Sequence, residues 1–228
     1  MVKPKICVAI TASSNKKTLD TIRQLQIHSP HLLEFRLDYM NEKPDLKTIR
    51  ESTNTKLIAT YRRTDQGGVL ECPEPERIKL LLEACDTGFN YLDLAITTPN
   101  LSKVIDEVHT RGAEVIVSYH DFEGTPSYEN LQSILGEIME KKADICKIIG
   151  TATSPRDNLT YLNIVHENPE TRLVSFAMGK DGLMSRIFSP LHGAEYTYAS
   201  AETGMESAPG QLTIVELIQI YRYMGAMC

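Results

Sequence analysis

The sequence predicts an α/β protein in which eight strand–helix units close into a (β/α)8 barrel. Short apolar runs rich in β-branched residues alternate with amphipathic segments of helical period. Eight such runs begin about 22–35 residues apart, which is the span of one parallel strand–helix unit. Because the chain has only 228 residues, eight units occupy nearly all of it, and this favours closure of the sheet into a barrel.

Each predicted strand is a mostly apolar run bounded by polar or turn-forming residues. A nearly continuous apolar run is typical of a parallel strand that is covered on both faces. In chain order the runs are 6–11 (ICVAIT), 32–39 (LLEFRLDY), 56–62 (KLIATYR), 91–96 (YLDLAI), 114–122 (EVIVSYHDF), 143–151 (ADICKIIGT), 172–179 (RLVSFAMG) and 194–200 (AEYTYAS).

The segments between these runs place apolar residues at helical spacing, as Leu19, Ile22 and Leu25 do in the first of them. Helices are therefore predicted at 18–27, 74–87, 99–111, 127–142, 156–167 and 211–224. An open doubly wound sheet is the structural alternative. The glycine-rich turn that usually follows its first strand is absent here, because residues 11–17 read TASSNKK.

Composition predicts a single globular domain over residues 1–228. Hydrophobic residues make up 42% and charged residues 24% of the chain, and no Gly/Ser-rich linker interrupts it. The net charge of −6 argues against bulk binding to nucleic acid or to an anionic membrane, but it is compatible with a local basic pocket.

The cysteines and the chain start indicate a reduced, cytoplasmic protein. The odd number of cysteines and the lack of a C-x-x-C pair predict free thiols. No signal-peptide pattern opens the sequence, and no apolar run is long enough to span a bilayer. The cysteines are Cys7, Cys72, Cys85, Cys146 and Cys228.

Polar residues interrupt the apolar pattern near the carboxyl ends of several strands, where barrel enzymes build their active sites. Because side chains alternate across a strand, Glu34, Arg36 and Asp38 are expected on one face of the second strand. They form either a buried ion pair or a polar clamp for substrate hydroxyls. In the third strand Thr60 and Arg62 share a face, so Arg62 either reaches the barrel mouth or lies in a solvated loop.

The fifth and sixth strands carry the most reactive side chains. His120 ends a buried run, where it is either a structural residue or a group that transfers protons. Lys147 shares a face with Ile145 and Ile149, which is uncommon for lysine in a central parallel strand. It either extends its amine towards the strand end or is a desolvated nucleophile that attacks ketones to form imines. In the second case His120 would move protons beside the imine.

Further candidates follow the seventh and eighth strands. Met178 is expected to pack in the barrel, and Arg186 lies just past the strand, either as an anion ligand or as a solvated arginine. The segment 207–211 contains a Pro-Gly turn before the last helix. It is either a plain connection or a lid whose Ser207 and Gln211 contact ligand.

Together these motifs resemble the type I 3-dehydroquinate dehydratases over nearly the whole chain. The matching motifs are Glu-Phe-Arg at 34–36, Tyr-His-Asp-Phe at 119–122, Lys147 in DICKI, Met-Gly-x-x-Gly-x-x-Ser-Arg at 178–186 and Ser-Ala-Pro-Gly-Gln at 207–211. The resemblance implies a TIM-barrel hydro-lyase of the shikimate pathway that converts 3-dehydroquinate to 3-dehydroshikimate. It implies no cofactor and no metal, and it allows a homodimer.

The resemblance also implies roles for the matched residues. Lys147 forms an imine with the C3 ketone, and His120 takes a proton from C2 and then acts as general acid as the C1 hydroxyl leaves. Arg186 binds the substrate carboxylate. The other expected contacts are positioning of the ring hydroxyls by Glu34, Arg36 and Arg62, lining of the pocket by Gln66, Met178 and Tyr198, and loop closure by Ser207 and Gln211. Tyr198 stands where the family often has phenylalanine.

One position departs from the family pattern. The family often has a glutamate before the Gly-Gly of the loop after the third strand, associated with orienting the histidine, whereas this chain has Gln66. Glutamine can hold an imidazole by a hydrogen bond but gives an imidazolium no full opposite charge. Weaker electrostatic support for His120 is therefore expected, unless Asp65 or Asp121 supplies the charge.

Two other functions stay open from the sequence alone. One is another Schiff-base barrel, a class I aldolase or transaldolase, although no phosphate-cradling glycine loop is evident. The other is a catalytically inactive barrel that binds a small acid, against which the presence of both Lys147 and His120 argues. Fold alone does not decide between these functions.

Overall fold

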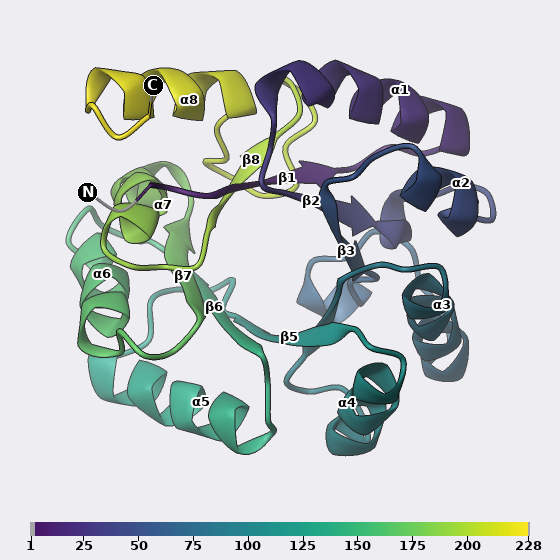
Figure 1. Ribbon diagram of the computed structural model, residues 1–228. Coiled ribbons are helices and arrows are strands. Elements are labelled where there is room, and N and C mark those ends of the chain that lie inside the picture. Colours follow the sequence, from purple (N-terminus) through teal and green to yellow (C-terminus); the bar gives the residue numbers. More distant parts are fainter. Residues whose placement is uncertain (1–2, 228) are drawn as a thin grey trace.

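Eight parallel strands surround a common axis in the computed structural model, which describes residues 3–227 (Figure 1). The strands are β1 (Ile6–Ile10), β2 (Leu32–Arg36), β3 (Lys56–Thr60), β4 (Tyr91–Ala95), β5 (Glu114–His120), β6 (Ile145–Thr151), β7 (Leu173–Met178) and β8 (Thr197–Ser200). Hydrogen-bonded neighbours follow the order β7-β6-β5-β4-β3-β2-β1-β8. The sheet is thus a nearly closed barrel, and the predicted fold class is confirmed. Each predicted run contains a strand, but the ends differ by up to three residues, and residues 37–39 of the second run form a 3-10 helix.

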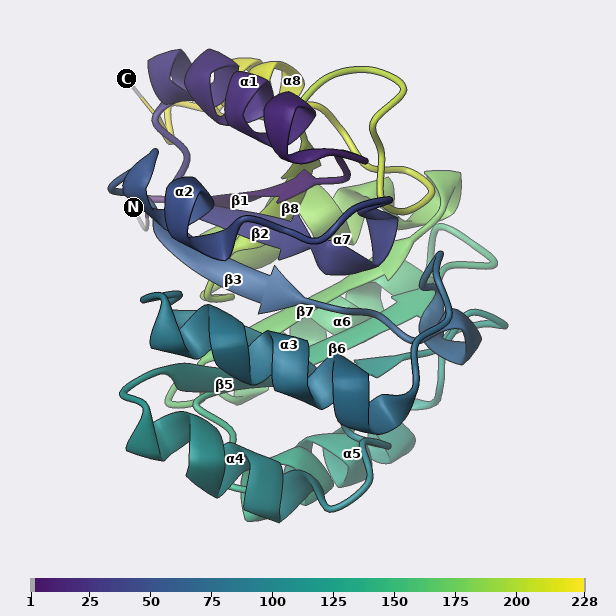
Figure 2. The same cartoon turned by 90° about the vertical axis from the view of Figure 1, so that its right-hand side faces the viewer.

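Helices cover the outside of the sheet (Figures 1 and 2). They are α1 (Asn15–Leu25), α2 (Leu46–Glu51), α3 (Glu74–Asp86), α4 (Leu101–Thr110), α5 (Tyr128–Glu140), α6 (Asp157–Glu167), α7 (Leu183–Phe188) and α8 (Ile214–Tyr223). The six predicted helices are confirmed, with ends that shift by a few residues. The sequence analysis missed α2 and α7, because six residues are too few to show a helical period.

Side-chain alternation divides the apolar residues into two layers. On β6, Cys146 and Ile148 belong to the layer between sheet and helices, whereas Ile145 and Ile149 belong to the barrel interior. The interior layer also contains residues from the other strands, such as Ile58. Lys147 therefore points into the barrel, as its position between two isoleucines predicted.

Side chains at several helix starts satisfy backbone N–H groups that have no partner within the helix. Ser14, Asp45 and Ser127 each accept an N–H in the first turn of the following helix. Thr213 forms a capping box with Glu216 at the start of α8. This box sets where α8 begins and so where the long β8–α8 connection ends.

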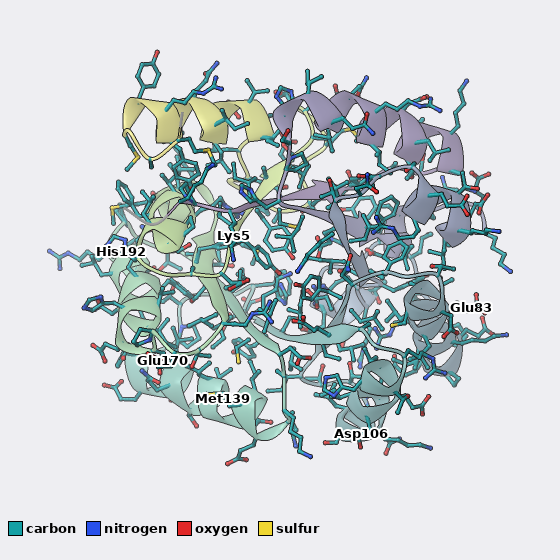
Figure 3. The ribbon with its side chains drawn as sticks, viewed as in Figure 1. Lys5, Glu83, Asp106, Met139, Glu170 and His192 are labelled. Atoms are coloured by element: carbon teal, nitrogen blue, oxygen red, sulfur yellow. The ribbon has the colours of Figure 1, made fainter. Side chains whose placement is uncertain are left out.

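The outer surface of the barrel carries charged side chains and some exposed apolar ones, such as Met139. Asp106 on α4 and Glu170 after α6 point away from the barrel (Figure 3). Between residues 3 and 227 no helix is both long and apolar enough to cross a membrane. The thiols of Cys7, Cys72, Cys85 and Cys146 are free, and Cys228 lies outside the described residues, as do positions 1 and 2.

Candidate active site

One cavity of about 240 Å³ lies inside the barrel towards the carboxyl ends of the strands. All the site residues predicted from the sequence line it: Glu34, Arg36, Arg62, Gln66, His120, Lys147, Met178, Arg186, Tyr198, Ser207 and Gln211. They come from five strands, from α7 and from the loops that follow β3 and β8. The barrel therefore gathers, around one space, groups that are up to about 180 positions apart in the chain.

Lys147 is buried at this cavity, with 4% of the residue exposed. Its Nζ lies 2.8 Å from Oδ2 of Asp93 and 3.7 Å from Oε1 of Glu34. It also donates a hydrogen bond of 3.1 Å to the hydroxyl of Tyr198. Ile145 and Ile149, which suggested apolar surroundings, precede and follow Lys147 on the same face of β6. The amine itself faces the two carboxylates. The amine therefore has charged partners at close range, in place of the apolar surroundings that the sequence suggested.

Asp93 is the main group that the sequence analysis missed. It is 1% exposed, and it forms an ion pair of 2.9 Å with Arg62 as well as the one with Lys147. Ser118 donates to its other oxygen at 2.7 Å. Burial by itself raises the pKa of Asp93, but the charges of Arg62 and Lys147 outweigh burial, so the pKa lies far below its usual value. A carboxylate in the centre of the apolar run YLDLAI was the available signal.

Arg36 forms the ion pair that the sequence left open. Its guanidinium donates to both oxygens of Asp38, at 2.8 and 2.7 Å. The chain turns into a short 3-10 helix at Leu37, so the alternation of the strand ends there and Asp38 does not line the cavity. The expected shared face of Glu34, Arg36 and Asp38 is therefore wrong for Asp38. Instead Asp38 holds Arg36 at the cavity and accepts the N–H of Val69 from the next loop.

His120 ends β5 two residues beyond Ser118, which pairs with Lys147 across the sheet. Its ring stacks on Phe122 with centroids 6.0 Å apart, and its buried Nδ1 has no hydrogen-bond partner among residues 3–227. Burial, and then the charges of Arg62 and Lys147, hold the pKa of His120 well below its usual value. The ring is therefore neutral at pH 7.

None of the three side chains considered as partners for His120 is hydrogen-bonded to its Nδ1. Gln66 lines the same cavity. Asp65 pairs with Arg63 at 2.7 Å on the surface, and Asp121 accepts backbone N–H groups from the turn that follows it. The acidic group that raises the pKa of His120 is Asp93, although its effect is smaller than the opposing ones.

Arg186 lies in α7 and is 1% exposed, so the alternative of a solvated arginine is wrong. Its guanidinium stacks on Phe176 at 4.4 Å and donates one long hydrogen bond of 3.5 Å to the carbonyl of Pro209. Its Nε is buried without a partner among the described residues, and desolvation lowers the pKa of Arg186 to about 10. A buried guanidinium in this state is a ready site for a planar anion such as a carboxylate.

The connection between β8 and α8 borders the cavity through Ser207 and Gln211. Figure 2 shows this segment beyond the strand ends, on the side to which the strand arrows point. The backbone N–H of Gly179 donates to Pro209 at 3.0 Å, which ties the loop to the end of β7. Gly210 has φ +73°, and a Cβ there would collide with the backbone of Gly179, so this close approach requires glycine.

The fold and this cavity define a (β/α)8-barrel enzyme with a lysine-centred site at the carboxyl ends of its strands. In the described part of the chain, His, Cys, Asp and Glu side chains form no group of three that would hold a metal ion. A family model described as Type I 3-dehydroquinase matches residues 6–227. The chain belongs to the type I 3-dehydroquinase family, and it is a hydro-lyase of the 3-dehydroquinate dehydratase class.

Individual relatives agree with this assignment. A 3-dehydroquinate dehydratase of Dehalococcoides mccartyi is 38% identical over 219 residues, which cover 96% of this chain and 95% of the relative. The crystal structure of the 3-dehydroquinate dehydratase of Geobacillus kaustophilus is 25% identical, with a TM-score of 0.88 over 96% of this chain and 91% of that one. The type I enzyme of Clostridium difficile, solved with covalent modified comenic acid, is also 25% identical, with a TM-score of 0.88 over 98% and 93%.

Replacement of Asp93 by asparagine should show how strongly the buried charges depend on it. The pKa of Asp93 is lower in the folded state than the value of about 3.9 expected when unfolded, so the carboxylate stabilises the fold above that value. This contribution is lost as the pH falls through the folded-state pKa. We expect Asp93→Asn to lower the free energy of unfolding by about 3–5 kcal/mol at pH 7, and the loss to shrink below about pH 4.

Urea unfolding across this pH range measures the difference between the parent and Asp93→Asn. Asp106→Asn, on the exposed face of α4, is the matched control and should stay within about 0.5 kcal/mol of the parent. A deficit in Asp93→Asn that is the same at every pH would contradict the assignment of the effect to the ionised carboxylate.

Proposed function

We propose that the chain dehydrates 3-dehydroquinate to 3-dehydroshikimate through a Schiff base on Lys147, with His120 as general acid and base. One observation carries the proposal: a buried lysine amine and a buried arginine, which has no carboxylate partner among residues 3–227, face the same cavity. An amine can bond covalently to a ketone, and the arginine can hold a carboxylate of the same molecule. 3-Dehydroquinate carries both groups.

Imine formation makes the elimination possible. The neutral amine of Lys147 attacks the C3 ketone, and loss of water gives an iminium. The iminium makes the C2 proton acidic, because the electron pair left at C2 is delocalised into an enamine. Collapse of the enamine expels the C1 hydroxyl, which leaves as water when a general acid protonates it. Hydrolysis of the product imine releases 3-dehydroshikimate and restores the lysine.

His120 is suited to the proton transfers by its place and its charge state. It stands on β5 beside β6, nearer the barrel mouth than Lys147, and both side chains line the cavity. Its lowered pKa keeps the imidazole neutral at pH 7, as a base that removes the C2 proton requires. The imidazolium formed in that step then protonates the departing hydroxyl.

The remaining cavity residues would hold the substrate in register for these steps. Arg186 would bind the carboxylate, and Glu34, Arg36 and Arg62 would contact the ring hydroxyls. Support for a covalent step also comes from the Clostridium difficile relative, which was solved with a covalently modified ligand.

Borohydride trapping tests the Schiff base directly. With 3-dehydroquinate and borohydride, the peptide that contains Lys147 should gain a stable mass, because reduction converts the imine to an amine that no longer hydrolyses. Lys147→Ala should lose this label, and its kcat should fall by at least about 10³-fold, because removal of a nucleophile has effects of this size or larger. Product formation is followed by the ultraviolet absorbance of the conjugated enone.

The exposed residue Lys180, which follows β7, provides the control. Lys180→Ala should keep both the label and the activity of the parent. A label on Lys180, or substrate binding without any label in the parent, would disprove the assignment, and the second result would identify a barrel that only binds a small acid.

A glutamate in place of Gln66 should shift the acid limb of the activity profile. In the parent this limb should lie below about pH 6.5, because the pKa of His120 is depressed from that ordinary value. A carboxylate at position 66 of the same cavity favours the imidazolium and therefore raises the pKa of His120. The limb of kcat/KM against pH should then move to higher pH in Gln66→Glu. Superimposable profiles would show that residue 66 does not act on His120.

The segment 201–211 should be protected when substrate binds. Ser207 and Gln211 border the cavity, and Ser207 donates both its N–H and its hydroxyl to the side chain of Gln211, so the loop has polar groups that can turn to a ligand. We expect slower amide hydrogen exchange in this segment with bound substrate or a reduced imine. Helix α4, on the outside of the barrel, serves as the internal reference. Equal exchange of the segment in both states would contradict a closing loop.

A further inference from the structure

We propose that Tyr198 relays a proton from the ammonium of Lys147 to Glu34, and so produces the neutral amine that attacks the substrate. The inference rests on the proposed Schiff-base function and adds a group that prepares the nucleophile. It addresses a requirement of that function: an ammonium has no lone pair and cannot attack a ketone, and Nζ of Lys147 lies between two carboxylates.

The geometry of the three groups forms a continuous proton path. Nζ of Lys147 donates to the hydroxyl oxygen of Tyr198 at 3.1 Å, and that hydroxyl donates to Oε1 of Glu34 at 3.2 Å. The direct separation of Nζ and Oε1 is 3.7 Å, which is too long for a hydrogen bond. Tyr198 is 4% exposed and its strand is paired with β1, so its hydroxyl is held at this point. Tyr198 therefore closes a gap that the other two groups do not close.

Glu34 is a better acceptor for this proton than Asp93, although Asp93 is closer to the amine. Asp93 is bound by the guanidinium of Arg62 as well as by Lys147, and these charges hold its pKa far below the usual value. The hydrogen bonds of Glu34 come instead from two neutral hydroxyls, those of Thr60 at 2.8 Å and Tyr198. Among residues 3–227 its ion pair is the one with Lys147. Protonation of Glu34 therefore breaks no arginine ion pair in the described part of the chain.

The transfer conserves protons and charge. One N–H bond of the ammonium breaks as that proton bonds to the hydroxyl oxygen of Tyr198, while the original O–H proton of Tyr198 bonds to Oε1 of Glu34. Lysine ends as a neutral amine, glutamate as a carboxylic acid, and tyrosine is unchanged. Burial, and then the charge of Glu34, raise the pKa of Tyr198, so a tyrosinate is disfavoured and the two transfers are concerted.

An internal relay has a distinct dependence on pH. Because the site as a whole gains and loses no proton, the rate of amine attack should be constant across neutral pH in the parent. Without the relay the ammonium must lose its proton to solvent, and the rate should rise up to about tenfold per pH unit while the ammonium predominates. The other charged or titratable groups around the amine are Cys7, Arg36, Arg62, Asp93, His120, Arg186 and Tyr196.

Several of these groups have pKa values displaced away from neutrality. Burial raises the pKa of the Cys7 thiol and of the Tyr196 hydroxyl, whereas those of His120 and Asp93 are lowered. They keep their charge states between about pH 7 and 8.5. A change in the rate of imine formation with pH in that interval therefore shows that the proton of Lys147 is lost to solvent and not through the relay.

The test is single-turnover imine formation, stopped by borohydride at successive times and measured by mass spectrometry at saturating 3-dehydroquinate. Tyr198→Phe should form the Lys147 imine at least about tenfold more slowly at pH 7, since proton-transfer groups contribute roughly 10²–10⁴-fold and water replaces part of the path. The defect should shrink as the pH rises to 8.5, while the parent stays constant. Saturation removes any change in substrate affinity from the comparison.

Tyr196→Phe is the matched control. Tyr196 is on the connection just before β8, its ring lies 5.4 Å from that of Tyr198, and it does not contact Lys147 or Glu34 by any hydrogen bond in residues 3–227. This variant should keep the rate and the flat profile of the parent. The two variants lose the same atom from the same region of the barrel, so a general packing effect would appear in both.

A double-mutant cycle tests whether tyrosine and glutamate act as one path. Glu34→Gln keeps a hydrogen-bond acceptor but cannot take the proton, so it should give the same pH-dependent defect as Tyr198→Phe. Adding Tyr198→Phe to Glu34→Gln should slow imine formation by no more than about twofold further. Two defects that multiply would show separate roles and overturn the relay.

Other outcomes separate the relay from the proposed function. A Tyr198→Phe profile as flat as that of the parent, whether at the same rate or uniformly slower, overturns the relay and leaves the Schiff base standing. If the parent itself consumes substrate without any trapped Lys147 imine, the Schiff-base proposal fails, and the relay fails with it.

Discussion

The burial of charge inside the barrel is the constraint on which the rest of the site depends. One oxygen of the Asp93 carboxylate forms ion pairs with both Lys147 and Arg62, and its other oxygen accepts a hydrogen bond from Ser118. Taking these groups out of water costs free energy that only close opposite charges and hydrogen bonds offset. Asp93, which lies on β4, therefore fixes the positions of Lys147 and Arg62 together.

The same constraint makes Arg186 informative, because no carboxylate in the described part of the chain pairs with it. Its guanidinium is as buried as Asp93, yet its close contacts are an aromatic ring and one long hydrogen bond to a carbonyl. An uncompensated buried cation is costly unless a ligand supplies the opposite charge. The cavity thus separates into a balanced part around the amine and a part that is electrostatically incomplete until an anion binds.

The chemistry of the amine follows from how the balanced part is connected. An ammonium held by two carboxylates is stable but unreactive, so a site that stabilises its lysine must also provide a way to deprotonate it. The hydroxyl of Tyr198 joins the amine to the less constrained of the two carboxylates. In residues 3–227 the buried Nδ1 of His120 has no hydrogen-bond partner, and burial with the charges of Arg62 and Lys147 lowers the pKa of His120, so the ring is neutral, as the proposed general base requires. In the proposed relay Asp93 stabilises the buried charges and Glu34 takes the proton of Lys147, so stability and reactivity depend on different carboxylates.

The sequence by itself determined the fold, because alternation within strands and the spacing of strand–helix units are local properties. It also determined that Lys147 faces the barrel interior, and its motifs predicted a set of residues that line one cavity. Tertiary structure alone decided which groups touch. The contacts of Lys147 with Asp93 and Tyr198 join residues 54 and 51 positions apart, and Asp38 left the cavity where β2 turned into a 3-10 helix. Which charged groups pair depends on how the closed barrel brings distant strands together, and no local sequence pattern encodes the distances between side chains on different strands.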